Sequence, residues 1–322
     1  MKLIIQIPCF NEAETLHLAL AALPRAVLGF DSVEWLIIDD GSSDNTLDVA
    51  KRCGVDHIVS HPYNQGLAKA FMTGVDACLF LGADVIVNTD ADNQYNADDI
   101  PALTKPILEG KAEIVVGARP ITEIEHFSPV KKFLQKLGSF VVRIASHTDI
   151  PDAPSGFRAM SRASAARLMV YNKYTYTLET IIQAGQTGIP ITSVPVRVNK
   201  DLRPSRLVKS ILSYVKRSIL TIIHILILYR PFHFFMMIGS LLFLSGLITG
   251  IRFLLYYFTG EGDGHIQSLI LGGILLTTGG GTWVMAIIGS LLAANRRLLE
   301  EIRLNLNITN KKFVPHLWSR HE

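Results

Sequence analysis

Residues 85–94 read Val-Ile-Val-Asn-Thr-Asp-Ala-Asp-Asn-Gln, an apolar run followed directly by two carboxylates. A strand over 85–87 would bring Asp90 and Asp92 to its carboxyl end, where open α/β sheets bind ligands. Because side chains alternate along an extended chain, both acids would point the same way. One or two carboxylates, completed by substrate phosphates, are how Mg²⁺ is usually held. The stretch therefore indicates a metal-bridged nucleotide diphosphate, although a solvated turn would also give so short a triplet.

Short apolar runs and helix-like stretches alternate through the first two hundred residues. Strands are expected at 3–7, 35–38, 57–59, 85–87, 114–116 and, later, 191–198, with helices beginning near Glu12, Asp44, Gly66, Asp98 and Val130. This alternation predicts βαβ crossovers and an α/β, Rossmann-like domain with a mostly parallel sheet.

Other predicted strands also end in polar residues. Residues 8–12 follow the first strand, residues 39–46 the second, and Arg119 follows the fifth. Turn formation and helix capping explain part of this pattern. Two adjacent acids, Asp39 and Asp40, exceed that need, because carboxylates there can accept from a nucleobase imino group and from ribose hydroxyls. Arg119 suits a phosphate, with a surface ion pair as the alternative.

Two long apolar stretches follow. Residues 232–258 hold one charged residue, Arg252, and residues 266–294 hold none. Each exceeds the ~20 residues that cross a hydrocarbon core. The connector 259–265 is short and polar, so we predict a transmembrane hairpin; two core helices of a large soluble domain are the alternative.

Lysine and arginine residues predict the orientation of this hairpin. Seven precede it between Lys200 and Arg230, three follow it at 296, 297 and 303, and the connector has none. We therefore expect a multi-pass protein of the cell (inner) membrane, with both termini and the first domain in the cytoplasm. The amino terminus does not resemble a signal peptide. Three cysteines, an odd number without metal spacing, fit reduced thiols.

Residues 206–229 repeat apolar side chains at helical spacing, with Lys209, Lys216 and Arg217 elsewhere on the wheel. An amphipathic helix lying in the membrane interface is expected, and a helix packed on the soluble domain is the alternative. Arg230-Pro231 would end it. The predicted organisation is a soluble domain over 1–205, a juxtamembrane helix over 206–231, two spans within 232–294 and a tail over 295–322.

Taken in order, six motifs resemble those of the inverting family 2 glycosyltransferases with a GT-A fold. They are Pro-Cys-Phe-Asn-Glu at 8–12, Asp-Asp-Gly-Ser-Ser-Asp at 39–44, Asn-Gln-Gly at 64–66, Asp-Ala-Asp-Asn-Gln at 90–94, Gly-Ala-Arg at 117–119 and Asp-Ala-Pro-Ser-Gly-Phe-Arg at 152–158. Within that family the chain is most similar to the dolichol-phosphate mannose synthase group and the bacterial polyprenyl-phosphate glycosyltransferases.

The resemblance implies roles for individual residues. Pro8, Asn11, Glu12 and Asp40 would hold the nucleoside; Asp90, Asp92 and Gln94 would bind Mg²⁺ or Mn²⁺, with Asp90 also meeting the ribose; Arg119 and Arg158 would contact phosphates; and Arg203 and Arg206 would lie on a basic loop at the site. Asp152 would position the acceptor or act as a weak base, or else be only a turn residue. The expected catalytic set is Asp92, Asp152, Arg119 and Arg158.

The expected reaction is hexosyl transfer, with inversion, from a nucleotide sugar to a polyprenyl (undecaprenyl or dolichyl) phosphate at the cytoplasmic membrane face. UDP-glucose or UDP-N-acetylglucosamine is favoured as the donor, followed by GDP-mannose. A monophosphate acceptor, whose second pKa is about 6, is already nucleophilic at cytosolic pH. No nucleic-acid partner is expected.

Glycines in the two spans predict close helix packing. Gly246 and Gly250 have small-xxx-small spacing, and residues 272–273 and 279–281 add five more glycines. They would pack the hairpin on itself or join subunits, and we expect a homo-oligomer.

Three other functions compete. A processive polysaccharide synthase would need a Gln-x-x-Arg-Trp signature, in which none of Trp35, Trp283 and Trp318 lies. A membrane scaffold that only binds nucleotide would not explain basic residues beside acids. A nucleotidyltransferase would show a glycine-rich, basic loop after its first strand, which residues 8–11 are not.

Overall fold

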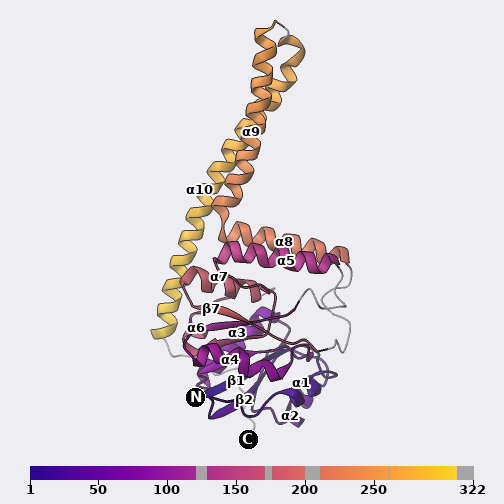
Figure 1. Ribbon diagram of the computed structural model, residues 1–322, viewed down its shortest axis with the longest axis vertical. Helices are drawn as coiled ribbons and strands as arrows, with labels where there is room; N and C mark the ends of the chain where they lie inside the picture. Colours follow the sequence, from indigo (N-terminus) through magenta and orange to yellow (C-terminus); the bar gives the residue numbers. More distant parts are fainter. Residues whose placement is uncertain (121–128, 171–175, 200–210, 261, 310–322) are drawn as a thin grey trace. The chain divides into compact units, whose positions relative to one another are not determined.

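A computed structural model describes residues 1–120, 129–170, 176–199, 211–260 and 262–309 (Figure 1). The chain divides into two compact units, of which one contains Met1–Ser218 and the other Ile219–Asn305. The predicted boundaries at 205, 231 and 294 stay predictions.

The first unit is built on one seven-stranded sheet. Its strands are β1 (Lys2–Cys9), β2 (Ser32–Asp39), β3 (His57–Ser60), β4 (Val85–Asn88), β5 (Ile114–Ala118), β6 (Arg158–Ser161) and β7 (Ile191–Pro195). They are ordered β3-β2-β1-β4-β6-β5-β7, and every pair is parallel except the two that β6 makes with β4 and β5. The predicted α/β class with a mostly parallel sheet is confirmed.

The expected strands are all present, but β6 was not expected. Its sequence, Arg-Ala-Met-Ser, lacks the β-branched residues that mark the others. It runs antiparallel between two apolar strands, β4 and β5, so its place is set by its neighbours rather than by its own propensity. The last strand ends at Pro195, earlier than predicted, because its partner β5 ends at Ala118, opposite Pro195, and the chain then pairs Val198 with Tyr95.

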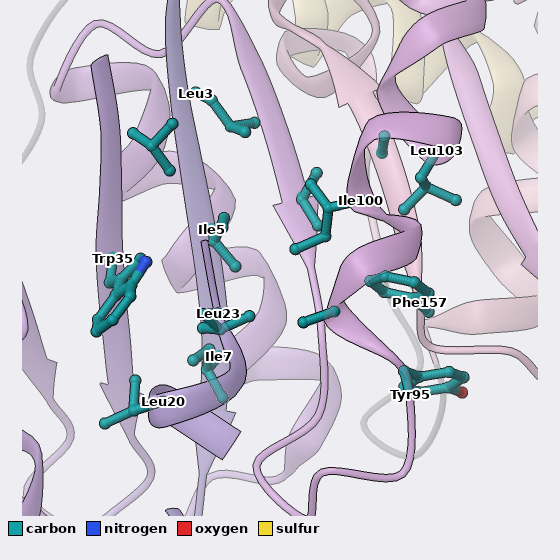
Figure 2. Close-up of a cluster of buried hydrophobic side chains, with 14 of the residues drawn as sticks. Leu3, Ile5, Ile7, Leu20, Leu23, Trp35, Tyr95, Ile100, Leu103 and Phe157 are labelled. Atoms are coloured by element: carbon teal, nitrogen blue, oxygen red, sulfur yellow. The ribbon is translucent and has the colours of Figure 1, made fainter. Parts of the chain in front are cut away.

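Helices cover both faces of the sheet. They are α1 (Leu16–Ala22), α2 (Thr46–Arg52), α3 (Leu67–Phe80), α4 (Ile100–Leu108, preceded by the 3₁₀ turn Ala97–Asp99), α5 (Pro129–Ser146), α6 (Arg162–Arg167) and α7 (Thr177–Thr187). The predicted helix starts lie within about one turn of the observed ones. On one face, a core packs β1 side chains such as Ile5 against Leu20 of α1 and Ile100 of α4 (Figure 2). Helix α3 contacts β1 and β2.

Helix α5 leaves a row of apolar side chains exposed. The row consists of Val130, Phe133, Leu137, Phe140 and Ile144, spaced by three and four residues, and Phe133 is 64% exposed. Side chains at this spacing lie on one face of a helix. The three cysteines are free thiols, as predicted.

The second unit contains the apolar hairpin. Helix α9 (Pro231–Phe258) and helix α10 (Ile266–Thr309) are joined by the 3₁₀ turn Gly262–His265, and the apolar part of α10 ends at Arg296. Both helices are long and apolar enough to span a membrane, yet only 11% and 17% of their most apolar windows are buried. A core helix of a soluble protein would be covered, so their exposure favours the membrane interpretation.

Glycines bring α9 and α10 into backbone contact. A Cβ added to Gly246 would lie 2.8 Å from the backbone nitrogen of Leu276, and one on Gly279 would lie 2.8 Å from that of Phe243. A Cβ on Gly250 would meet nothing within 4 Å. Gly246 therefore packs the hairpin on itself, which is one of the two predicted alternatives. Self-association between subunits stays a prediction.

Helix α8 (Ile211–Tyr229) precedes the hairpin and ends before Pro231, as predicted. The Tyr229 hydroxyl accepts a 3.1 Å hydrogen bond from Arg296, whose guanidinium lies 4.5 Å from the Tyr229 ring centroid. The start of the predicted helix, at 206–210, lies outside the described residues. Its position in the membrane interface stays a prediction.

Gly246→Leu should destabilise the hairpin, whereas Gly250→Leu should have little effect. At 246 the new side chain meets backbone that cannot move aside, and overpacking of this kind costs about 1–3 kcal/mol. At 250 the added side chain points into open space. Thermal unfolding of the two variants in detergent, followed by tryptophan fluorescence, checks the pair; equal midpoints would contradict the packing described.

Candidate functional site

Loops that follow β1, β2 and β4 meet at the carboxyl edge of the sheet. Because β1 lies between β2 and β4 and all three are parallel, residues 10–15, 40–46 and 89–96 leave at the same edge. Pro8 is a buried residue near the end of β1. This edge therefore brings together most of the predicted donor-binding residues.

The loop after β1 is fastened to the loop after β2. The Asn11 side chain accepts a 2.8 Å bond from the backbone nitrogen of Ser43, and the Asn11 nitrogen donates to the Ser42 hydroxyl at 2.9 Å. The backbone nitrogen of Glu12 donates to the Thr46 hydroxyl at 2.8 Å. Asn11 has a φ of +56°, which asparagine tolerates better than most residues. The polar run after β2 thus fixes Asn11 and Glu12 at the edge.

Both carboxylate oxygens of Asp40 accept hydrogen bonds from other parts of the domain. Its carboxylate accepts from the backbone nitrogens of Gln65 and Gly66 at 2.9 and 2.8 Å, and Nδ1 of His61 lies 2.7 Å from the same group. The other ring nitrogen of His61 lies 3.0 Å from the Thr73 hydroxyl. With 3% of Asp40 exposed, this geometry makes it the anchor of the 61–66 turn. Its predicted contact with the nucleoside stays untested.

Asp90 and Asp92 lie on the loop after β4, as expected. Asp92 accepts a 3.1 Å bond from the backbone nitrogen of Gln94. Enclosure by protein and the neighbouring charge of Asp92 raise the pKa of Asp90 to about 7, while Arg119 and Arg158 act to lower it. A cation shared by the two carboxylates would relieve this repulsion.

The acidic pair suits a metal that is shared with substrate. Among the described residues, no three His, Cys, Asp or Glu side chains come together as a metal-binding group. Mg²⁺ commonly takes one or two carboxylates and completes its shell with phosphate oxygens and water. Asp90 and Asp92, with Gln94 beside them, fit that arrangement rather than an all-protein cage.

Arg119 and Asp152 form a buried, two-point ion pair. Nε of Arg119 lies 2.7 Å from one carboxylate oxygen of Asp152, and a terminal nitrogen lies 3.0 Å from the other. Their side chains are 7% and 1% exposed. Because this pair occupies both oxygens of Asp152, the geometry favours a role for Asp152 in orienting Arg119 over a role as a free base.

Arg158 lies in the core rather than at the edge. It is the first residue of β6, is fully buried, and sits opposite Asn88 in the register with β4. Its guanidinium donates to the Thr180 hydroxyl and to the carbonyl oxygens of Ser155 and Thr177. Burial lowers its pKa. With no exposed surface, Arg158 does not lie where it could touch a phosphate, so the expected contact lacks structural support.

A buried polar network that the sequence did not suggest lies beneath the acidic pair. Gln6 donates to the Asn88 side chain at 3.0 Å, and Asn88 in turn contacts the Tyr176 hydroxyl and the carbonyl of Gly156 at 2.9 Å. A Cβ on Gly156 would lie 3.0 Å from a carboxylate oxygen of Asp90. The network therefore supports the backbone on which Asp90 rests. A polar residue inside an apolar strand, Gln6, was the available signal.

Tyr95 holds the far end of the acidic loop. Its hydroxyl accepts a 2.9 Å bond from the Gly156 nitrogen, and its ring stacks on Phe157 at 5.1 Å (Figure 2). Arg203 and Arg206, the predicted basic residues, lie outside the described residues. The described segment that leads toward them ends at Asn199, whose backbone nitrogen donates to Gln94 at 2.9 Å.

The sequence profile of glycosyl transferase family 2 matches residues 4–169, just over half of the chain. The chain belongs to glycosyl transferase family 2. It is thus a glycosyltransferase with a GT-A-like fold, not a non-catalytic scaffold, and the predicted resemblance is confirmed.

Three relatives illustrate the family. The chain is 29% identical over 213 residues to UDP-N-acetylglucosamine--dolichyl-phosphate N-acetylglucosaminyltransferase of Methanococcus voltae, covering 59% of this chain and 83% of that one. It is 29% identical over 219 residues to undecaprenyl-phosphate mannosyltransferase of Micrococcus luteus, covering 64% and 88%. With dolichol-phosphate mannosyltransferase of Pyrococcus furiosus it shares 30% identity over 169 residues, covering 50% and 47%.

Solved structures agree on the fold. Glucosyl-3-phosphoglycerate synthase from Mycobacterium tuberculosis with phosphoglyceric acid aligns with a TM-score of 0.55 and 20% identity, covering 70% of this chain and 78% of that one. The same enzyme crystallised with Mn²⁺, UDP and glucosyl-3-phosphoglycerate aligns at 0.51 and 21%, covering 70% and 78%.

Asp90→Asn should stabilise the metal-free protein above pH 7. The pKa of Asp90 is higher in the folded state than its ordinary value of 3.8, so folding is most favoured while Asp90 is protonated, and this advantage is lost as pH rises through about 7. An amide removes the penalty, which is on the order of 1–2 kcal/mol. Thermal unfolding in EDTA at pH 8 and pH 5 measures it.

The exposed Glu14 provides the matched control, Glu14→Gln, whose midpoint should change equally at both pH values. A gain for Asp90→Asn that is no larger at pH 8 than at pH 5 would contradict the charge repulsion inferred at this loop.

Proposed function

We propose that this protein transfers a hexosyl residue from a nucleotide diphosphate sugar to a polyprenyl phosphate at the cytoplasmic face of a membrane, with inversion. The observation that carries the proposal is the acidic pair Asp90 and Asp92 at the carboxyl edge of a family 2 domain, in a chain that also has an exposed apolar hairpin. The names of the three relatives support the acceptor class.

On the donor side, the ends of β1 and β2 and the loops that follow them provide the binding groups. Asn11 and Glu12 are fixed beside the β2 loop, and Asp39, which is 2% exposed and accepts from the Ser42 nitrogen at 3.2 Å, lies next to the anchoring Asp40. Pro8 lies in the buried run that leads into this edge. We assign nucleoside binding to this group, with Asp40 acting mainly by holding the 61–66 turn.

The reaction centre needs a displacement at the anomeric carbon and a stable diphosphate leaving group. A divalent cation held by Asp90, Asp92 and Gln94 would neutralise the departing diphosphate. Arg119 presents five N–H donors, two of which the pair with Asp152 uses, so the same guanidinium can also donate to a phosphate. Arg158 would act from within the core, as a buried positive charge that favours the ionised form of Asp90.

The acceptor brings its own nucleophile. A lipid monophosphate is largely dianionic near pH 7 and needs no strong base to attack. Both oxygens of Asp152 bond to Arg119, so Asp152 is not free to act as a base. An acceptor that needs no base agrees with this geometry, and the site would then act mainly by aligning the two substrates. Inversion follows from a single in-line displacement.

Membrane attachment would bring this site to its lipid substrate. The exposed apolar row of α5 is flanked by Lys132, Lys136 and Arg143, the combination that binds the interface of an anionic membrane. The α9–α10 hairpin would anchor the chain in the inner membrane, and the lysine and arginine residues outside it support cytoplasmic termini.

We favour UDP-glucose or UDP-N-acetylglucosamine as the donor, with GDP-mannose next. The experiment is to incubate membranes containing the protein with radiolabelled nucleotide sugars and to identify the labelled lipid. A single acid-labile glycosyl phospholipid is expected from one donor. Polymer of increasing length would instead support a processive synthase, and no transfer from any donor would contradict the proposal.

Asp92→Asn should lower transfer by at least 100-fold while leaving the fold intact. The change removes the proposed metal-binding charge from a half-buried loop rather than from the apolar core, and loss of a key electrostatic group typically costs this much. EDTA should likewise stop the wild-type enzyme, and Mg²⁺ or Mn²⁺ should restore it. Activity of the variant within a few-fold of wild type would remove Asp92 from the mechanism.

Arg203→Ala and Arg206→Ala should impair use of the lipid phosphate more than binding of the donor. Arg203 lies four residues beyond Asn199 in sequence, which limits its distance from that residue to about 14 Å. Nucleotide-sugar affinity, measured beside the acceptor-dependent rate, checks this. Equal loss of both would assign these cations to the donor.

A further inference from the structure

The chain that follows β7 crosses to the acidic loop instead of leaving the sheet. Val196 still donates to the Ala118 carbonyl at 3.0 Å, and Val198 then forms an antiparallel bridge with Tyr95. Asn96 donates to the Arg197 carbonyl at 3.3 Å. Residues 196–199 therefore lie along the loop that carries Asp92.

The side chain of Asn199, the last residue of this segment, contacts the turn formed by residues 93–95. Its amide nitrogen lies 2.9 Å from the carbonyl oxygen of Asn93 and 3.3 Å from that of Tyr95, so its two hydrogens can serve both carbonyls. Asn93 has a left-handed φ of +56°. A turn in this conformation keeps its direction only where its surroundings hold it.

The same turn is also held from the other side. The Tyr95 hydroxyl accepts from Gly156, and the Tyr95 ring packs on Phe157, while the carboxylate of Asp92 receives the Gln94 nitrogen within the turn. The position of Asp92 beside Asp90 thus depends on how the carbonyls of residues 93–95 are directed.

We propose that Asn199 is a positioning residue for the acidic pair. Its amide directs the Asn93 and Tyr95 carbonyls and so holds Asp92 where it can share a divalent cation with Asp90, although it touches neither carboxylate and lies 106 residues from Asn93 in sequence. The inference deepens the proposed function and rests on it.

The test measures Mn²⁺ binding by the full-length, detergent-solubilised protein, using electron paramagnetic resonance of the free ion. Asn199→Ala should weaken Mn²⁺ affinity about ten-fold, which corresponds to about 1.4 kcal/mol. Asn199→Asp, which keeps the shape but lacks the two donor hydrogens, serves as a second variant should the alanine protein not fold. It should weaken affinity at least three-fold, because its carboxylate repels the two carbonyls. Asn199→Gln should recover most of the affinity.

Arg197→Ala is the matched control. It lies on the same segment and removes the ion pair with Asp99, whose contacts are 2.7 and 2.9 Å, but leaves the backbone bonds intact. Its Mn²⁺ affinity should equal that of wild type, even if the thermal midpoint falls as far as in Asn199→Ala.

The outcomes separate the two claims. Wild-type affinity in both Asn199→Ala and Asn199→Asp overturns the positioning role, and so does an equal loss in Arg197→Ala, which would assign the effect to attachment of the whole segment. Absence of Mn²⁺ binding by the wild-type protein, together with metal-independent transfer, overturns both the metal site and this inference.

Discussion

Repulsion between two carboxylates on one short loop governs the design of this domain. In the proposed metal site Asp90 binds a cation in its ionised form, and the surrounding protein together with the charge of Asp92 makes that form costly. Two buried guanidinium groups offset the cost. Arg119 approaches from the end of β5, and Arg158 lies under the loop at the start of β6. The antiparallel strand in an otherwise parallel sheet is what puts the second cation there.

This constraint also explains the buried polar chemistry below the site. Gln6, Asn88 and Tyr176 satisfy one another within an apolar core, where unpaired polar groups would be expensive. Phe71 stacks on Tyr176 at 3.9 Å, and Arg158 lies 5.3 Å from the same ring. The loop that carries the acids therefore rests on polar side chains that pair with one another.

Local patterns in the sequence were enough to predict the parallel strands, the first helices and the acidic pair, because each is written in a few adjacent residues. They were not enough to predict β6, whose four residues have no strand signature. The burial of Arg158 was missed for the same reason, because Arg158 is the first residue of β6. Asp40 reads as a ligand because it is one of two adjacent acids, but its partners are backbone nitrogens 25 and 26 residues away. Asn199 had no local signal at all. Long-range hydrogen bonds of this kind leave no mark on hydrophobic periodicity.

Because Asp40 anchors the 61–66 turn, mutations at Asp40 should act on folding, whereas mutations at Asp92 should act on the reaction. Removing the Asp40 carboxylate would leave two backbone nitrogens and a buried histidine without their hydrogen-bond partner. Each unpaired group would lower the free energy of unfolding by about 1–3 kcal/mol. In a cell, such a loss acts through the fraction of folded protein. Alleles at Asp40 should therefore be temperature-sensitive and respond to cold or to chaperone supply, whereas alleles at Asp92 should be null at every temperature.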